Sequence, residues 1–157
     1  MTDPLMALAT GFGLGLSPWA SGTLGSLLGL VLAWWLLGRT RRLQITVTLA
    51  LLLAAVPVCH LAELALGGKD DGRIVFDEVV AFPVAIVGQA AVRQPLALAS
   101  AFVVYRVLDA TKPPPVSLAE AVPGGAGIVL DDAIAAAMTW LVMAAGLVLW
   151  RRRQVSS

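Results

Sequence analysis

The segment DDGRIVFDEVV, at residues 70–80, places four carboxylates within nine residues of a chain that is otherwise strongly apolar. A charged side chain in lipid hydrocarbon costs at least about 2.5 kcal/mol. Carboxylates beside long apolar runs therefore need basic residues, water or a metal ion as partners. This segment decides how the chain is organised, because the surrounding apolar segments must fold so that the acids reach such partners.

The composition is that of a small integral membrane protein with a single domain over residues 1–157. The chain is 59% hydrophobic and 13% charged, whereas soluble domains carry about 25% charged residues. The net charge of +1 gives no argument for nucleic acid as a partner. The single cysteine excludes an intrachain disulfide, and no cysteine cluster suggests zinc. The N-terminus lacks the basic start of a secretory signal peptide, so the apolar segments are expected to remain in the mature protein.

The apolar segments predict an all-α fold, namely a multi-pass membrane bundle of about four to five hydrophobic helices. Residues 43–66 are long enough to cross about 30 Å of hydrocarbon at about 1.5 Å per residue. Gly38 and Gly67 are expected to end helices. The other helices are expected at residues 24–37, 79–92, 96–108 and 133–150.

Three parts of the chain are less regular. Residues 79–92 and 96–108 are short for full spans and are expected to be tilted, interfacial or packed inside the protein. Residues 5–16 contain several glycines, which predicts a short helix or a re-entrant segment. Residues 124–127, GGAG, predict a flexible turn, and Asp131 and Asp132 are expected to open the last helix.

Counting crossings predicts a single polar site. If each of the five apolar segments crosses once, the turns at 17–23, 67–78 and 109–132 share one membrane face, which collects eight of the ten acids. The opposite face carries seven arginines. The positive-inside rule would place those arginines in the cytoplasm and the acidic face outside.

The acids on the shared face are candidate metal ligands. Hard cations such as Mg²⁺ prefer carboxylate oxygens and keep a substrate phosphate and waters as further ligands. Asp77 and Asp109 adjoin apolar segments, where an unpartnered charge is costly. Asp131 or Asp132 could complete the ligand set. The alternative is a solvated loop with helix-capping acids, which suits Asp131 well.

Basic residues follow the second acidic group. Arg106 and Asp109 are three residues apart and therefore neighbours on a helix, and Lys112 lies three residues further on. Arginine offers a planar fork for phosphate and lysine a point charge. An Arg106–Asp109 ion pair of purely structural role is the alternative, and the two interpretations can coexist.

Other polar positions are more ambiguous. The glycine run that contains Gly124 and Gly125 could expose backbone N–H groups to a phosphate. The hydroxyls of Thr23 and Ser26 could bind phosphate or cap a helix. His60 lies three residues before Glu63, for which a buried hydrogen-bonded pair is favoured over catalysis.

Several catalytic classes are excluded. The chain has no G-x-x-x-x-G-K-[ST] loop and no G-x-S-x-G elbow. A single histidine excludes a multi-histidine phosphatase. The Asp-Gly pair at 71–72 could suggest a CDP-alcohol phosphatidyltransferase. The spaced aspartates that follow in that family are missing here, so this class is excluded.

Five blocks of sequence, in order, resemble the phosphatidylglycerophosphatase A family. They are GFGLGLSP with GTLGS at 11–18 and 22–26, CH at 59–60, DDGRIVFDE at 70–78, RVLDATKPPP at 106–115 and GGAGIVLDD at 124–132. The resemblance implies Mg²⁺-dependent hydrolysis of phosphatidylglycerophosphate to phosphatidylglycerol and phosphate in the bacterial cytoplasmic (inner) membrane. It also implies a phospholipid partner and a site on the cytoplasmic face, against the arginine distribution.

The chain departs from the family pattern at three positions. Histidines are common in the family at the positions of Asp71 and Pro123, and glycine is common at that of Ala81. These departures favour a carboxylate–metal mechanism over one that depends on histidine. Attack by water and attack by an aspartate both stay open.

The resemblance implies a set of functional residues. The expected catalytic residues are Asp77, Glu78 and Asp109. The expected phosphate-binding residues are Arg106, Lys112, Thr23, Ser26, Gly124 and Gly125. The expected Mg²⁺ ligands are Asp77, Glu78, Asp109, Asp131, Asp132 and Asp70.

Two alternative functions remain. A small multi-pass ion or proton carrier would explain intramembrane acids and a helix with His60 and Glu63, but not the glycine turns or the Lys112-Pro113 block. A lipid-phosphate phosphatase for another head group would use the same site.

Overall fold

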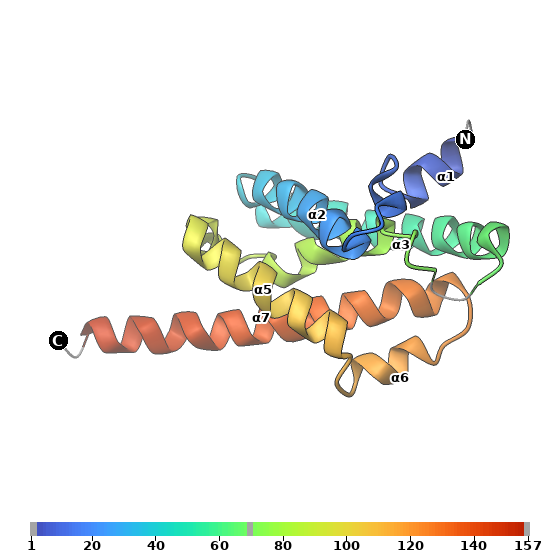
Figure 1. The fold of residues 1–157 in the computed structure, drawn as a ribbon. Coiled ribbons are helices and arrows are strands. Elements are labelled where there is room, and N and C mark those ends of the chain that lie inside the picture. Colours follow the sequence, from blue (N-terminus) through green and yellow to red (C-terminus); the bar gives the residue numbers. More distant parts are fainter. Residues whose placement is uncertain (1–2, 69–70, 156–157) are drawn as a thin grey trace.

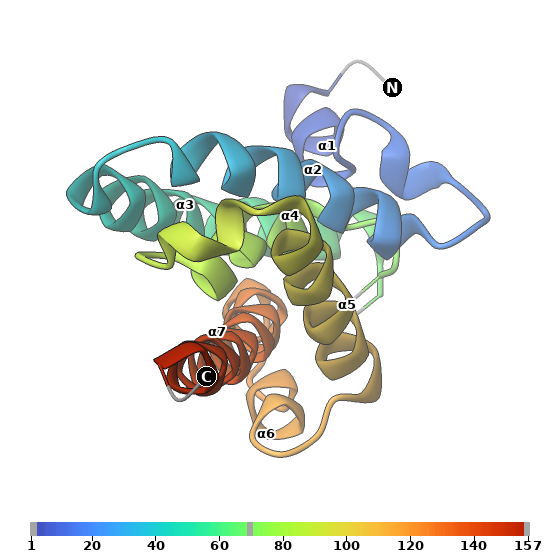
Figure 2. The ribbon, with the colours of Figure 1, turned by 90° about the vertical axis from the view of Figure 1, so that its left-hand side faces the viewer.

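The chain folds into helices that cross one another around a short central helix (Figures 1 and 2). This computed structural model describes residues 3–68 and 71–155, and these contain no β-strand. The elements are α1 (Pro4–Ala9), η1 (Leu14–Leu16), α2 (Ser21–Leu37), α3 (Arg41–Leu66), α4 (Phe76–Ala81), η2 (Phe82–Ile86), η3 (Ala90–Arg93), α5 (Pro95–Thr111), α6 (Val116–Glu120) and α7 (Gly125–Val155). The prediction of an all-α fold is confirmed.

Two helices in the described part of the chain are long and apolar enough to cross a membrane. They are α3 and the Gly125–Gln154 part of α7. The apolar α2 is shorter, with 17 residues. The expected glycine ends are confirmed, since Gly38 caps α2 and Gly67 ends α3 in the left-handed conformation at φ 74°. The finer prediction, a bundle of four to five spans, stays a prediction.

The segment expected as one helix at 79–92 is broken into three short pieces. Within this segment Pro83 lacks a backbone N–H, and Gly88 has a φ of 72° that turns the chain between η2 and η3. Val80, Ala81 and Phe82 have no exposed surface. This segment is therefore packed inside the protein, which was one of the placements expected for it.

The start of α7 differs from the prediction. The helix begins at Gly125 rather than after Asp132, so the glycine run is not a flexible turn and Asp131 does not open the helix. A Cβ atom at Gly125 would lie 2.1 Å from the Val56 carbonyl oxygen of α3, and one at Gly127 would lie 1.9 Å from the Val122 carbonyl oxygen. The glycines let the backbone of α7 approach its neighbours closely, which a side chain at these positions would prevent.

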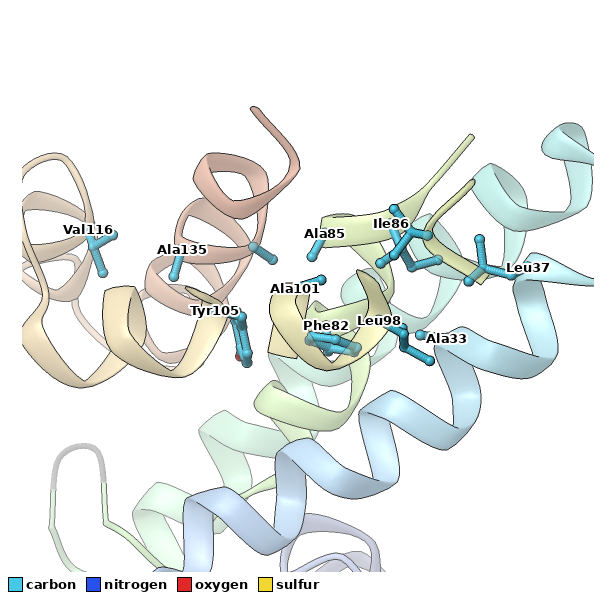
Figure 3. Close-up of a cluster of buried hydrophobic side chains, with 12 residues drawn as sticks. Ala33, Leu37, Phe82, Ala85, Ile86, Leu98, Ala101, Tyr105, Val116 and Ala135 are labelled. Atoms are coloured by element: carbon cyan, nitrogen blue, oxygen red, sulfur yellow. The ribbon is translucent and has the colours of Figure 1, made fainter. Parts of the chain in front are cut away.

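Aromatic packing fixes the central segment against α5. The ring of Phe82 meets those of Tyr105 and Phe102 edge to face, with centroids 5.4 Å and 5.9 Å apart. Figure 3 shows Phe82 and Tyr105 within this buried cluster, between the ribbons of the central segment and α5. Since α4 also packs on α2, α3 and α7, the N-terminal end of α4 is held where these helices converge.

Candidate active site

A cavity of about 400 Å³ lies where the predicted polar turns meet. Residues from four separate parts of the chain line it: 17–22, 72–78, 106–112 and 131–132. Its charged lining residues are Asp77, Glu78, Arg106, Asp109, Lys112, Asp131 and Asp132. The convergence that the crossing count predicted is therefore present in the fold.

The first turn of α4 presents two of the acids. Ile74 and Val75 are buried just before it, and the Val75 N–H donates to the Ala9 carbonyl oxygen at 2.9 Å. This anchors the loop, so Asp77 and Glu78 enter the cavity in a fixed register. Carboxylates in a first turn are also favoured by the helix dipole.

Arg106 joins three elements through one nitrogen. Its Nη1 donates to Asp109 Oδ2 at 2.5 Å, to Glu78 Oε1 at 3.2 Å and to Ser26 Oγ at 3.2 Å. The predicted Arg106–Asp109 pair therefore exists inside the candidate site. Burial raises the pKa of Glu78 to about 7, because it disfavours the charged form more than the charge of Arg106 favours it.

Glycines on α2 make room for this network. A Cβ atom at Gly22 would lie 2.3 Å from Glu78 Oε1, and one at Gly25 would lie 2.8 Å from Glu78 Oε2. Ser26, on the same helix face, donates to Glu78 Oε2 at 3.3 Å. The sequence alone assigns no role to Gly22 and Gly25. Their spacing of three residues, next to Ser26, could have indicated a helix face that packs closely against another part of the chain.

A second group of charges also lines the cavity. Lys112 ends α5 and its Nζ lies 2.8 Å from Asp131 Oδ2 and 3.0 Å from Glu120 Oε1. Asp131 and Asp132 are each 3% exposed. The Asp132 N–H donates to Asp131 Oδ1 at 2.9 Å. Their location inside α7, rather than at its start, points them into the protein.

Some predicted phosphate ligands lie elsewhere. Ser26 is completely buried behind Glu78 and Arg106, and neither it nor Thr23 is among the described residues that line the cavity. Gly124 and Gly125 pack against His60 and line a separate hollow of about 300 Å³. Phosphate binding by these four residues stays a prediction, and we do not include them in the site proposed below.

Three further positions complete the comparison with the sequence. Asp70 lies outside the described residues. Asp71 is paired with Arg73 at 2.6 Å, and this hydrogen bond lowers the pKa of Asp71 to about 2. His60 Nδ1 and Glu63 Oε2 are 3.6 Å apart, but the His60 side chain is 50% exposed, so the pair is not the buried one expected.

The charge of the cavity fits a bound cation. Five carboxylates face two basic side chains, so acids outnumber bases in the lining even where burial keeps some of them protonated. An anionic phosphate would be repelled by such a cavity unless cations enter with it. The carboxylates offer only oxygen atoms as metal ligands, which Mg²⁺ prefers. Oδ2 of Asp132 is buried without a hydrogen-bond partner among the described residues.

The arrangement is not a ready-made ligand shell. Within residues 3–68 and 71–155, no group of three or more acidic, histidine or cysteine side chains is placed to hold a metal ion. Arg106 and Lys112 instead occupy oxygens of Glu78, Asp109 and Asp131. A cation would therefore have to share or replace these contacts.

The cavity gathers acidic and basic side chains at the ends of apolar helices, and comparison with known sequences gives the family. The sequence model of "Phosphatidylglycerophosphatase A" matches residues 7–147. The chain belongs to this family, and it is a phosphatase.

Three relatives illustrate the match. A phosphatidylglycerophosphatase A of Escherichia coli is 33% identical over 86% of this chain and 78% of its own length. One of Haemophilus influenzae is 33% identical over 91% and 88%. A Bacteroides thetaiotaomicron protein, named provisionally as a phosphatidylinositol-3-phosphatase, is 32% identical over 87% and 89%. No solved structure matches the chain significantly.

Proposed function

We propose that this protein hydrolyses the terminal phosphomonoester of phosphatidylglycerophosphate and releases phosphatidylglycerol and inorganic phosphate. The observation that supports this most is the single cavity in which five acids meet Arg106 and Lys112. In the reaction, the bond between phosphorus and the glycerol oxygen breaks, and that oxygen leaves as an alcohol after gaining a proton. The phosphoryl group passes to water, either directly or by way of an aspartyl phosphate.

The basic residues position the phosphate. Arg106 offers a planar guanidinium that Glu78 and Asp109 hold in place. Lys112, at the end of the same helix, is held by Asp131. Both cations would stabilise charge on the phosphoryl oxygens in the transition state.

The acids would hold Mg²⁺. Asp77, Asp109 and Asp132 are the proposed principal ligands, with Glu78 and Asp131 in support, because all five line the cavity. When bound, the ion would polarise the phosphate and lower the pKa of a coordinated water. Asp109 then has two functions, since it also fixes Arg106.

Membrane placement follows from the apolar helices. We propose that α3 and α7 cross the bacterial cytoplasmic membrane within a multi-pass fold, so that the acyl chains of the substrate stay in lipid while the phosphate enters the cavity. The active site is assigned to the cytoplasmic face, where the family resemblance places synthesis of the precursor lipid. The arginine distribution argues for the reverse orientation.

Removing the metal should stop catalysis. Purified protein in excess chelator is expected to release phosphate from phosphatidylglycerophosphate at least about a hundredfold more slowly, because the acidic cavity would then repel the substrate. Added Mg²⁺ should restore the rate. Helix content measured by circular dichroism should be the same in chelator, which separates catalysis from unfolding. Hydrolysis at the full rate in chelator would contradict the metal assignment.

A second head group is the main competing substrate. The name of the Bacteroides relative points to a phosphomonoester on inositol, and the same cavity chemistry could act on that group. The family match favours either phosphatase over an ion or proton carrier.

A further inference from the structure

The end of the molecule away from the candidate active site concentrates basic residues. All ten acids of the chain lie at residue 3 or within 63–78 and 109–132. Figure 1 shows the end of α2, the start of α5 and the end of α7 on one side of the molecule, with α7 extending beyond the others. The arginines of this end are Arg39, Arg41, Arg42, Arg93, Arg151, Arg152 and Arg153.

Among the described residues, five of these arginines have no acidic partner. No ion pair within residues 3–68 and 71–155 involves Arg39, Arg41, Arg42, Arg93 or Arg151. Their charge is therefore available to anions outside the chain. Anionic groups of other molecules that lie at this end could bind these arginines.

The guanidinium groups are held against the protein surface. Arg39 Cζ lies 4.6 Å from the ring centroid of Trp35, and Arg93 Cζ lies 5.7 Å from that of Trp34. A Cβ atom at Gly88 would lie 3.1 Å from Arg41 Nε. Such contacts with aromatic rings and a bare backbone orient the charges instead of leaving them extended in solvent.

A hollow adjoins two of these side chains, Trp34 and Arg93. It has a volume of about 480 Å³ and is lined by Trp34, Ala90, Ala91, Arg93, Gln94 and Pro95. Trp34 is 52% exposed and the nearby Leu96 is 81% exposed. Tryptophan and arginine beside exposed apolar residues are typical of the boundary between lipid tails and head groups.

The distance between the two ends suits a membrane. The 17 residues of α2 run from the candidate active site to this basic end and span about 26 Å. The hydrocarbon core of a bilayer is about 30 Å thick. The active site and the basic end therefore reach opposite membrane surfaces if the protein spans the bilayer.

We propose that Arg39, Arg41 and Arg93, with Trp34 and Trp35, form a binding site for the head group of an anionic phospholipid in the leaflet opposite the active site. The arginines match the phosphate charge, and the exposed tryptophans match the interfacial region that the lipid occupies. The inference rests on the membrane placement in the proposed function, but it does not depend on catalysis. Phosphatidylglycerol, the proposed product, belongs to this class of lipid.

The site can be tested through the fluorescence of its tryptophans. The full-length protein is reconstituted in phosphatidylcholine vesicles with brominated phosphatidylglycerol or brominated phosphatidylcholine, and the quenching gives the relative affinity of the two lipids. The W34F/W35F variant lacks the two tryptophans of the proposed site. The difference in quenching between the wild type and this variant therefore reports on lipid at this site. We expect the wild-type protein to bind phosphatidylglycerol more tightly than phosphatidylcholine. The ratio of the two affinities should fall by about tenfold or more in R39Q/R41Q/R93Q, since each basic residue at an anionic surface strengthens binding about fivefold.

Matched variants separate a built site from diffuse charge. R151Q/R152Q/R153Q removes the same charge from the end of α7 and should keep the preference within about threefold, and R39K/R41K/R93K should keep most of it. An equal loss in the two glutamine variants, no preference in the wild type, or equally strong competition by inorganic phosphate would each overturn the proposal. Circular dichroism checks that the variants are folded. Phosphate release is measured separately, so its absence would count only against the proposed function.

Discussion

Asp109→Asn should lower phosphate release from phosphatidylglycerophosphate at least about a hundredfold. Asp109 lines the cavity, is 8% exposed and accepts a hydrogen bond from Arg106 at 2.5 Å. An amide at this position has no charge to share between Arg106 and a metal ion, so both the phosphate fork and the cation would be weakened. The measurement is steady-state phosphate release in detergent with saturating Mg²⁺. Asp77→Asn is expected to behave in the same way.

The chain offers a control for this loss. Asp71 is also an acid near the cavity, but it pairs with Arg73 and is not among the described residues that line the cavity. Asp71→Asn should therefore retain activity within about twofold, since exposed ion pairs contribute little. If Asp77→Asn and Asp109→Asn both kept full activity while folded, the acids would not be the catalytic group.

Gly125→Ala should lower the free energy of unfolding by about 2 kcal/mol or more. The added methyl group would lie 2.1 Å from the Val56 carbonyl oxygen and 2.5 Å from the His60 nitrogen. These are backbone atoms of α3, which cannot rotate away as a side chain can, so α7 would have to move off α3. Denaturant unfolding followed by circular dichroism measures the effect.

Gly146 is the matched control, because it lies in the same helix with nothing within 4 Å of an added Cβ atom. Gly146→Ala should raise stability by about 0.5–1 kcal/mol, as alanine favours helix over glycine. Should Gly125→Ala instead match Gly146→Ala in stability but lose phosphate release, Gly125 would bind phosphate, as the sequence suggested, rather than pack against α3.

The sequence predicted the features that follow from local chemistry. Gly38 and Gly67 end their helices, as predicted. This could be predicted because glycine at a helix terminus acts through its own backbone and not through a tertiary contact. The meeting of Asp77, Asp109 and Asp132 in one cavity followed from counting alternate crossings. That count gave the correct grouping even though the segment at 79–92 is not a single helix.

The features that the sequence did not predict depend on which surfaces touch. A GGAG run has the composition of a turn, but Gly125 and Gly127 lie in a helix, at positions where α3 and the chain near Val122 come too close for a side chain. Similarly, Ser26 has the hydroxyl of a phosphate ligand, yet it supports Glu78 and Arg106 from behind. A single sequence does not reveal the partner of a small residue.

Comparing lipid head groups tests the central claim most directly. Purified protein with Mg²⁺ is given phosphatidylglycerophosphate, phosphatidylinositol 3-phosphate and phosphatidic acid in matched mixed micelles, and phosphate release is measured for each. We predict the highest kcat/KM for phosphatidylglycerophosphate, with phosphatidylglycerol and phosphate formed in equal amounts, and release at least about a hundredfold slower from Asp109→Asn. A folded protein that releases no phosphate from phosphatidylglycerophosphate, or that clearly prefers another head group, would contradict the proposed function.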